Sequence, residues 1–402
     1  MRGKLWVLMV TAFVDMLGLV IVLPLLPFYA QKLGANATVV GALIAAFSVA
    51  QLASAPVWGR FSDRYGRRPA LLSGLLISAA AYIIFAFAGS LWLLMLSRIV
   101  QGFGGGTIGV IQAYVADVSD PRDRAKGLGW LSAATSLGAV VGPAIGSLLI
   151  HFFGRNAPGI GAAVLCVGVS VFAWKYLGES HEVSPASDAP RRSGASAVWQ
   201  VVANPKEPAA RLIWIYAIAI GAFYGTVPTM PLVLGKRLAI TEQTVGYVIM
   251  YLGGMGVIVR VWILGRLADW LGEARLARLG LTLLAAGLAI VGGINSYLTM
   301  FIACTLMPLG TAFVFPAVTA SLSRVVSASE RGLYMGVQHT FGGVSRVAFP
   351  LAAGATMDRF GVGIPFFVAG ALVAATLLLT LQMEAYTEPP VPTVRPSVAG
   401  SG

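Results

Sequence analysis

The sequence predicts an all-α polytopic membrane protein with twelve transmembrane helices in two pseudo-symmetric six-helix bundles. Composition is the first reason, because 57% of the 402 residues are hydrophobic and only 11% are charged. A soluble domain carries about a quarter charged residues. The second reason is a highly charged stretch, residues 59–68, between two long apolar runs. Such a stretch cannot lie in hydrocarbon, so it predicts a tight loop between two spanning helices.

An internal repeat is the third reason. Residues 59–63 return in weaker form at 265–269, which is 206 positions later, and Pro143 matches Pro350 at an offset of 207. Because this offset is about half of the chain, the halves are expected to be parallel repeats about an axis along the membrane normal. Substrate sites in such folds lie at the repeat interface near the membrane midplane.

Each predicted span is long enough to cross a hydrocarbon core of about 30 Å. The first six are 5–29, 39–59, 69–89, 91–116, 127–150 and 158–178, and the last six are 211–234, 243–267, 276–295, 297–322, 332–357 and 361–383. The predicted domains are an amino-terminal bundle over 1–178, a cytoplasmic linker over 179–210, a carboxy-terminal bundle over 211–383 and a disordered tail over 384–402. A short interfacial helix is expected at 197–202 within the linker.

The net charge of +12 follows the pattern of a membrane protein. Of the 28 Lys and Arg residues, five fall in predicted outer loops, three lie within spans and 20 lie inside. Basic residues gather in cytoplasmic loops, so both termini are predicted to be cytoplasmic and nucleic acid is excluded as a partner. Cys166 and Cys304 lie in apolar runs and are interpreted as small apolar side chains rather than as a disulfide or metal pair.

Asp15 alone among the 16 acidic residues lies deep in a predicted span. A charge there costs about 3 kcal/mol, which marks the position as a functional hypothesis. Burial favours the neutral acid, so Asp15 is predicted to bind and release a proton. The alternative is a structural carboxylate that pairs with a helix end or an arginine.

A polar stripe follows in the fourth predicted span. At about 100° per residue, Arg98, Gln101 and Gln112 share a face with three glycines. Polar groups at this depth must face protein or water. We therefore expect Arg98 to act in proton or substrate handling and the two glutamines to line the substrate cavity. Close packing of a neighbouring helix is the alternative role for the glycines.

The fifth predicted span carries Gly138, Gly142, Pro143 and Gly146. Glycines four positions apart form a smooth face for close helix contact, and a proline removes one backbone hydrogen bond and bends the helix. This pattern is expected to govern how the two halves fit together.

Arginines in the second half suggest a different chemistry. Arg346 lies near the middle of its predicted span on one face with His339, whereas Arg260 lies nearer the cytoplasmic end and can extend to the interface. Arg346 either meets backbone carbonyls and water or binds an anionic group of the substrate. His339 could titrate near neutral pH, although a simple hydrogen-bonding role is the alternative.

Catalytic patterns are absent from the sequence. The three histidines, His151, His181 and His339, are scattered, and no phosphate loop or cluster of metal ligands occurs. The protein is therefore predicted not to be an enzyme and to need no metal or cofactor.

These motifs resemble the major facilitator superfamily, and among its members the twelve-span drug:proton antiporters of the tetracycline-efflux type. The resemblance rests on the loop pattern Gly59-x-x-x-Asp63-Arg64-x-Gly66-Arg67-Arg68, on Arg98 to Gly102, on Gly138 to Gly146, and on Asp15-Met-Leu-Gly18 followed by Pro24 and Pro27. It departs from tetracycline pumps at Ala81-Tyr82 and at Gly256, where those pumps tend to carry acidic residues or a histidine.

The resemblance implies a conformational latch made by the charged loop and Asp117. Asp63 would meet the cytoplasmic start of the eleventh span in the outward-open state, and a loop arginine would meet Asp117. Protonation of Asp15 would drive the switch, with Arg98 tuning it. The fifth span would carry the motif associated with antiporters.

The predicted function is proton-coupled export of an amphipathic small molecule by alternating access, with the proton as coupling ion. The expected setting is the bacterial inner membrane, with a monomeric chain surrounded by lipid. The central cavity is expected to use the aromatic residues Tyr224, Tyr251, Phe313 and Phe315 together with Arg346. The alternatives are a transporter of a specific anionic metabolite or lipid that uses Arg346 and Arg260, and a receptor or sensor that transports nothing.

Overall fold

A computed structural model describes residues 2–120, 123–179, 194–327, 329–381 and 383. The predicted tail over 384–402 and residues 180–193 of the predicted linker lie outside these residues. The helices of the first half are α1 (Arg2–Val22), α2 (Leu26–Lys32), α3 (Ala37–Tyr65), α4 (Arg67–Ala86), α5 (Leu91–Gly105), α6 (Ile108–Val118), α7 (Arg124–Phe153) and α8 (Ala157–Tyr176). Those that follow are α9 (Gly194–Ala203), α10 (Pro208–Ile220), η1 (Gly221–Gly225), η2 (Val227–Thr229), α11 (Met230–Leu238), α12 (Val245–Trp262), α13 (Leu264–Gly292), α14 (Tyr297–Val325), α15 (Arg331–Phe360), α16 (Ile364–Ala375) and η3 (Thr376–Thr380).

Several of the predicted continuous spans are interrupted, among them the first, the fourth and the seventh. The first breaks between α1 and α2 at Pro24, since proline removes a backbone donor and disfavours the helix before it. The fourth breaks at Gly106 between α5 and α6, and the seventh passes through a π-helical turn, η1, and a 3₁₀ turn, η2, that contains Pro228. The helix expected at 197–202 is present as the slightly longer α9.

Ten helical spans in the described residues are long and apolar enough to cross a membrane, by length and composition. The two remaining predicted spans coincide with α15, which has 30 residues, and with the shorter apolar helix Ile364–Thr380. The protein is an integral membrane protein built almost wholly of helices.

The internal repeat recurs in the backbone. Gly66 has φ 103° between α3 and α4, and Gly272 has φ 74° within α13, at the matching position 206 residues later. Gly154 and Gly361, offset by 207, likewise have φ values of 84° and 105° after long helices. Positive φ is cheap only for glycine, so the same sharp corners recur in both halves.

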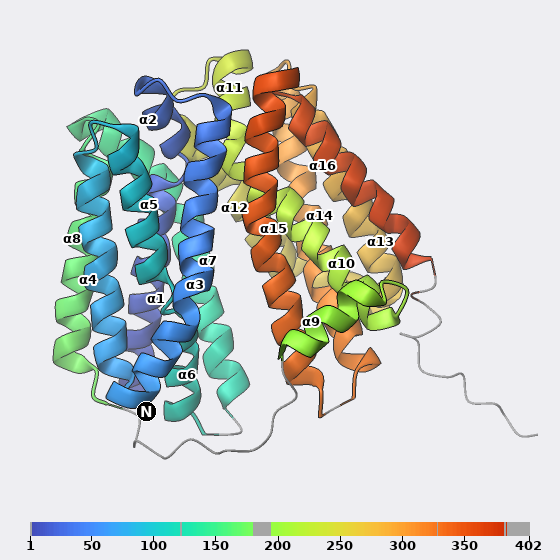
Figure 1. Ribbon diagram of the computed structural model, residues 1–402, viewed down its shortest axis with the longest axis horizontal. Helices are drawn as coiled ribbons and strands as arrows, with labels where there is room; N and C mark the ends of the chain where they lie inside the picture. The colour runs from blue at the N-terminus through green and yellow to red at the C-terminus, as the bar shows by residue number, and fades with distance from the viewer. Residues whose placement is uncertain (1, 121–122, 180–193, 328, 382, 384–402) are drawn as a thin grey trace, which may run out of the picture.

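The helices form two bundles side by side, with α1–α8 in one and α10–α16 in the other (Figure 1). We call the end of the molecule that carries residues 59–68 and the amino terminus the motif face, and the opposite end, which carries α2 and α11, the far face. Helices α3 and α15 meet antiparallel between the bundles, and so do α7 and α12. In Figure 1 the ribbons of α3 and α15 lie closest near the far face and diverge towards the motif face.

Candidate functional site

Asp15 lies in a hollow of about 640 Å³ in the first half. Helices α1, α6 and α7 line it, with Met16 and Leu131 among the apolar side chains and Gln112 and Thr135 among the polar ones. Asp15 is half-buried and has no hydrogen bond or ion pair with any other described residue. A carboxyl group that borders a hollow and lacks a partner can exchange a proton or meet a ligand. The predicted cavity residue Gln112 lies in this hollow with Asp15, within the first half rather than between the halves.

The glycines of α7 hold it against α1. A Cβ atom added at Gly138 would lie 2.6 Å from the carbonyl oxygen of Phe13, and one at Gly146 would lie 2.5 Å from that of Ile21. Gly142 likewise faces the Leu17 carbonyl oxygen at 2.9 Å. The predicted smooth face thus packs within the first half, on both sides of Asp15, and not between the halves. The expectation that these glycines set the fit between halves is wrong, because α1 occupies their face.

Pro143 does contribute to the fit between the halves. Its carbonyl oxygen would lie 1.9 Å from a Cβ atom added at Gly246 of α12, so these backbones approach as closely as glycine allows. One turn further, the Ser147 hydroxyl donates to the Glu242 carbonyl oxygen at 2.9 Å and accepts from the Gly246 amide at 3.0 Å. These contacts join α7 and α12 near the far face.

Arg98 is only 1% exposed and lies inside the first half. Its guanidinium donates to the side-chain oxygen of Gln101 and stacks over the Phe47 ring, 4.7 Å from the ring centroid. Gln101 is 4% exposed and is not among the residues of the Asp15 hollow. The placement of Gln101 in the cavity is therefore wrong, because Arg98 needs its oxygen as an acceptor in the bundle core.

The charged loop forms a compact network at the motif face. Arg67 donates to Asp63 at 2.8 Å and to Asp117 at 3.0 Å, so the predicted contact between a loop arginine and Asp117 is present. Arg68 donates to the carbonyl oxygen of Trp174 in α8. Asp63 is thus held within its own half in this conformation. The other predicted latch residues, Gly59 and Arg64, flank this network on α3.

Sequence reasoning missed Glu179, which completes the loop network. Its carboxylate accepts from the backbone amides of Arg67 at 2.9 Å and Arg68 at 3.1 Å, at the start of α4. Gly66 offers no side chain to cap this helix, and a Cβ atom there would lie 2.4 Å from a Glu179 oxygen. A helix start without a capping side chain favours an anion at this position, and that is the signal in the sequence.

The far face is closed by a second carboxylate that sequence reasoning missed. Asp358, near the end of α15, accepts from the backbone amides of Ala37 at 3.0 Å and Thr38 at 2.8 Å, and from the Thr38 hydroxyl at 2.6 Å. These groups form the first turn of α3. Burial alone would raise the pKa of Asp358, but the bonds from Thr38 and Ala37 outweigh burial and lower it from its ordinary 3.8. Lys32 and Glu242 add an ion pair of 2.6 Å between the halves.

The aromatic residues predicted for the cavity divide into two groups. Tyr224 stacks on Phe315 with ring centroids 6.2 Å apart, and Tyr216 packs edge-on against Phe315 at 5.5 Å. Phe313, by contrast, is 2% exposed in the core, and Tyr251 bonds to Thr305 of α14 at 2.8 Å. The placement of Phe313 in a cavity is wrong, because its side of α14 faces the bundle interior.

The two arginines of the second half differ in their surroundings. Arg346 is half-buried in α15 and has no hydrogen bond or ion pair with a described residue. Arg260 is exposed on α12. The interpretation of Arg260 as a residue that extends to the interface fits its exposure.

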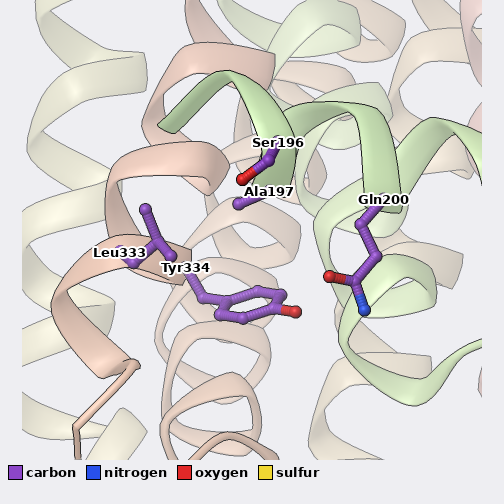
Figure 2. Close-up of a pocket in the computed structure, with 5 residues that line it drawn as sticks. All are labelled: Ser196, Ala197, Gln200, Leu333 and Tyr334. Carbon is purple, nitrogen blue, oxygen red and sulfur yellow. The ribbon is translucent and has the colours of Figure 1, made fainter. Parts of the chain in front are cut away.

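A second hollow, of about 310 Å³, lies at the motif face between α9 and the start of α15. Figure 2 shows Ser196 and Gln200 of α9 opposite Leu333 and Tyr334 of α15. Helix α9 therefore rests on the second half.

Two repeated helical bundles, spans suited to a membrane and an unpaired carboxyl group in an open hollow define a helical membrane transporter rather than an enzyme. The chain belongs to the Major Facilitator Superfamily, whose sequence profile matches residues 8–291 and 212–400. The two overlapping matches agree with the internal repeat.

Relatives and solved structures cover nearly the whole chain. Multidrug resistance protein 2 of Bacillus subtilis (strain 168) is 27% identical over 381 residues, which are 93% of this chain and 94% of that protein. The class D tetracycline resistance protein of Salmonella ordonez is 30% identical over 350 residues, or 85% and 86% of the two chains. A bacterial homologue of the human lysosomal transporter Spinster, crystallised in an inward-facing and unoccupied conformation, aligns with a TM-score of 0.80 at 12% identity over 96% of this chain and 98% of that one. At this identity the likeness shows the fold alone.

Proposed function

We propose that this protein is a proton-coupled antiporter that exports amphipathic small molecules by alternating access. The observation that carries the proposal is Asp15, an unpaired carboxyl group half-buried in a hollow of about 640 Å³. A proton and a substrate that both need this hollow stabilise different states of Asp15, and competition of this kind couples their movements. The names of the relatives, multidrug and tetracycline resistance proteins, support drug-like substrates.

The proposed setting is the bacterial inner membrane, with twelve spans, both termini in the cytoplasm and one chain as the working unit. α15 and Ile364–Thr380 supply the two spans beyond the ten that meet the length and hydropathy requirements. On this orientation the motif face is cytoplasmic and the far face is outside. Since α3 and α15 contact each other from the far face to mid-span, this orientation makes the conformation inward-open.

The register of α3 and α15 supports a reciprocal outward-open state. Facing positions are Thr38 with Asp358, Gly41 with Pro350, and Leu52 with Gly343, so their numbers add up to between 391 and 396. The same sums place Asp63 opposite residues 328–333, and α15 begins at Arg331. If the helices closed at the motif face, the Asp63 carboxylate would meet the amino-terminal end of α15, where a negative charge is favourable. Asp63 would then leave Arg67, and the loop network would act as the proposed latch.

Proton movement in everted vesicles tests the proposal. Cationic and neutral amphiphiles added to energised vesicles should drive proton release through the wild type, and Asp15→Asn should abolish this release while the protein stays folded. Asp120→Asn, in the loop after α6, removes a carboxylate outside the hollow and should leave the release unchanged. If Asp15→Asn retains full coupling, or if folded wild-type protein moves no proton with any compound, the proposal fails.

A transporter of a specific anionic metabolite or lipid is the second candidate. Arg346 favours it, because a half-buried cation without a partner attracts an anion. Arg260 gives it little support, since that side chain is exposed. Export of anions alone, lost in Arg346→Gln and insensitive to Asp15→Asn, would favour this candidate over drug:proton antiport.

A further inference from the structure

The second half carries an aromatic surface that the proposed mechanism has not used. It consists of Tyr216 on α10, Tyr224 on η1 and Phe315 on α14, and we call these three residues the aromatic shelf. Phe315 lies between the other two rings, at centroid distances of 5.5 Å from Tyr216 and 6.2 Å from Tyr224. Tyr224 is 45% exposed, so one end of the shelf is open to a ligand.

A π-helical turn holds the open end of the shelf in place. Helix η1 has one extra residue per turn, and such turns are frequent at functional sites. The glycines at the two ends of η1 both pack against Phe349 of α15. A Cβ atom added at Gly221 would lie 2.4 Å from the Phe349 ring, and one added at Gly225 would lie 2.4 Å from the Phe349 Cβ atom. The turn buries Phe223 and directs its neighbour Tyr224 outwards. The position of Tyr224 is therefore set by the backbone.

Arg346 lies at the edge of the shelf. A Cβ atom at Gly342 would lie 3.0 Å from the Tyr216 ring, and Arg346 is one turn further along the same side of α15. The neighbouring Gly343 faces Leu52 of α3, so this side of α15 fronts the first half. Arg346 is also within electrostatic range of Tyr216 and His339.

The second half offers Arg346 no counter-charge at this depth. The acidic residues of its described part lie in loops or near helix ends, and they are Glu242, Asp269, Glu273, Glu330 and Asp358. Arg346 itself has no hydrogen bond or ion pair there, and a guanidinium presents a planar set of donors that suits carboxylate, sulfonate or phosphate oxygens. An aromatic surface beside a guanidinium without a protein partner suits a ring that bears an acidic group.

We propose that Arg346 and the aromatic shelf form an anion-accepting subsite, which binds the part of the substrate that carries an aromatic ring and a negatively charged group. The subsite lies in the second half, whereas Asp15 lies in the first, so a substrate that reaches both is an aromatic anion or zwitterion. This inference rests on the proposed transport function for its biological meaning, but binding at the subsite is separable from proton coupling.

Three probes of one shape and different charge test the subsite: naphthalene-2-sulfonate, 2-naphthalenemethanol and 2-naphthylmethylammonium. Their affinities are measured by equilibrium dialysis against the full chain in lipid nanodiscs. The wild type should bind the sulfonate more tightly than the alcohol. Arg346→Gln should weaken sulfonate binding about tenfold, the effect of losing one charged hydrogen bond, and should change alcohol binding less than twofold. Alcohol binding thus reports that the variant is folded.

Two further variants sharpen the result. Arg346→Lys keeps the charge and should retain part of the sulfonate affinity, while Arg260→Gln removes an exposed arginine of the same half and should retain all of it. Phe315→Ala should weaken all three probes together, because it removes part of the shelf. Equal sulfonate affinity in the wild type and Arg346→Gln would overturn the proposal, and so would an equal loss in Arg260→Gln.

The failures of the two proposals are distinguishable. The subsite is tested by sulfonate binding to Arg346→Gln and antiport by the proton release of Asp15→Asn, so each proposal has its own variant and its own measurement. Charge-selective binding without any proton release would support the subsite and contradict antiport. Proton release by cations with no sulfonate preference would contradict the subsite and leave antiport standing.

Discussion

The two ends of the α3–α15 pair carry the same arrangement of a carboxylate and a helix start, but the two helices are in contact at only one of these ends. At the far face the Asp358 carboxylate of α15 binds the first turn of α3, at 2.8 Å from the Thr38 amide. At the motif face Asp63 of α3 stands in register with the first turn of α15, but it pairs with Arg67 of its own half at 2.8 Å. Each end places a carboxylate near one helix end opposite the amino terminus of an antiparallel partner. In this conformation one end forms the contact with the partner helix, and the other end holds its carboxylate within its own half.

The largest expected effect comes from blocking the closed end. Gly246→Leu places a side chain where a Cβ atom alone would lie 1.9 Å from the Pro143 carbonyl oxygen, and a backbone atom cannot move aside cheaply. Overpacking costs about 1–3 kcal/mol, so the population closed at the far face should fall about fivefold or more. Spin labels at Arg60→Cys and Gly332→Cys, across the motif face, should report a shorter distance by pulsed EPR, and export should stop.

Gly168→Leu is the matched control for this substitution. No atom lies within 4 Å of a Cβ atom at Gly168, so the same change should leave both distance and export as in the wild type. An unchanged distance in Gly246→Leu would show that closure at the far face does not depend on the α7–α12 contact.

The next effect comes from removing the charge at the closed end. Asp358→Asn keeps the shape of the side chain but loses the anion at the amino terminus of α3. Such a charge contributes about 0.3–1 kcal/mol at an exposed helix end, so the inward-open population should fall about two- to fivefold. Thr38→Val removes one of the three donors and should shift the same labels in the same direction. A shift towards a longer motif-face distance would contradict the role of Asp358.

The matching change at the open end should act in the opposite direction. Asp63→Asn weakens the proposed contact with α15 in the outward-open state, so the inward-open population should rise by a similar small factor and transport should slow. The compounds that bind should stay the same, because Asp63 lies at the motif face, away from the hollow of Asp15. A changed list of binding compounds would argue against a latch and for a role in substrate choice.

The carboxylates also differ in how far the sequence could predict their roles. Asp15 and the loop of Asp63 stand out locally, one as a charge in an apolar run and the other as a charged motif between two such runs. Asp358 and Glu179 are ordinary acids near helix ends. Asp358 binds the Thr38 amide, 320 positions away in the sequence, and Glu179 binds the Arg68 amide, 111 positions away. Only the tertiary fold brings these helix starts to them.

The aromatic residues show the same limit at a shorter range. Phe313 and Phe315 are two positions apart on α14, so their side chains point to different sides of the helix. Hydrophobicity does not tell which side faces a neighbouring helix and which faces open space. The structure buries Phe313 and places Phe315 between Tyr216 and Tyr224.

The smallest effect concerns pH, and it separates the far-face carboxylate from Asp15. The contacts of Asp358 with α3 lower its pKa from 3.8, so the carboxylate stabilises closure fully above that value and loses the contribution as pH falls through the lowered pKa. Between about pH 5 and 8 its contribution is therefore constant. The distance between the motif-face labels, plotted against pH over this range, should give parallel curves for the wild type and Asp358→Asn, displaced by a constant amount. In Asp15→Asn this distance should no longer change with pH. If Asp358→Asn removed this pH dependence instead, the proton that switches the transporter would bind at the far face and not in the Asp15 hollow.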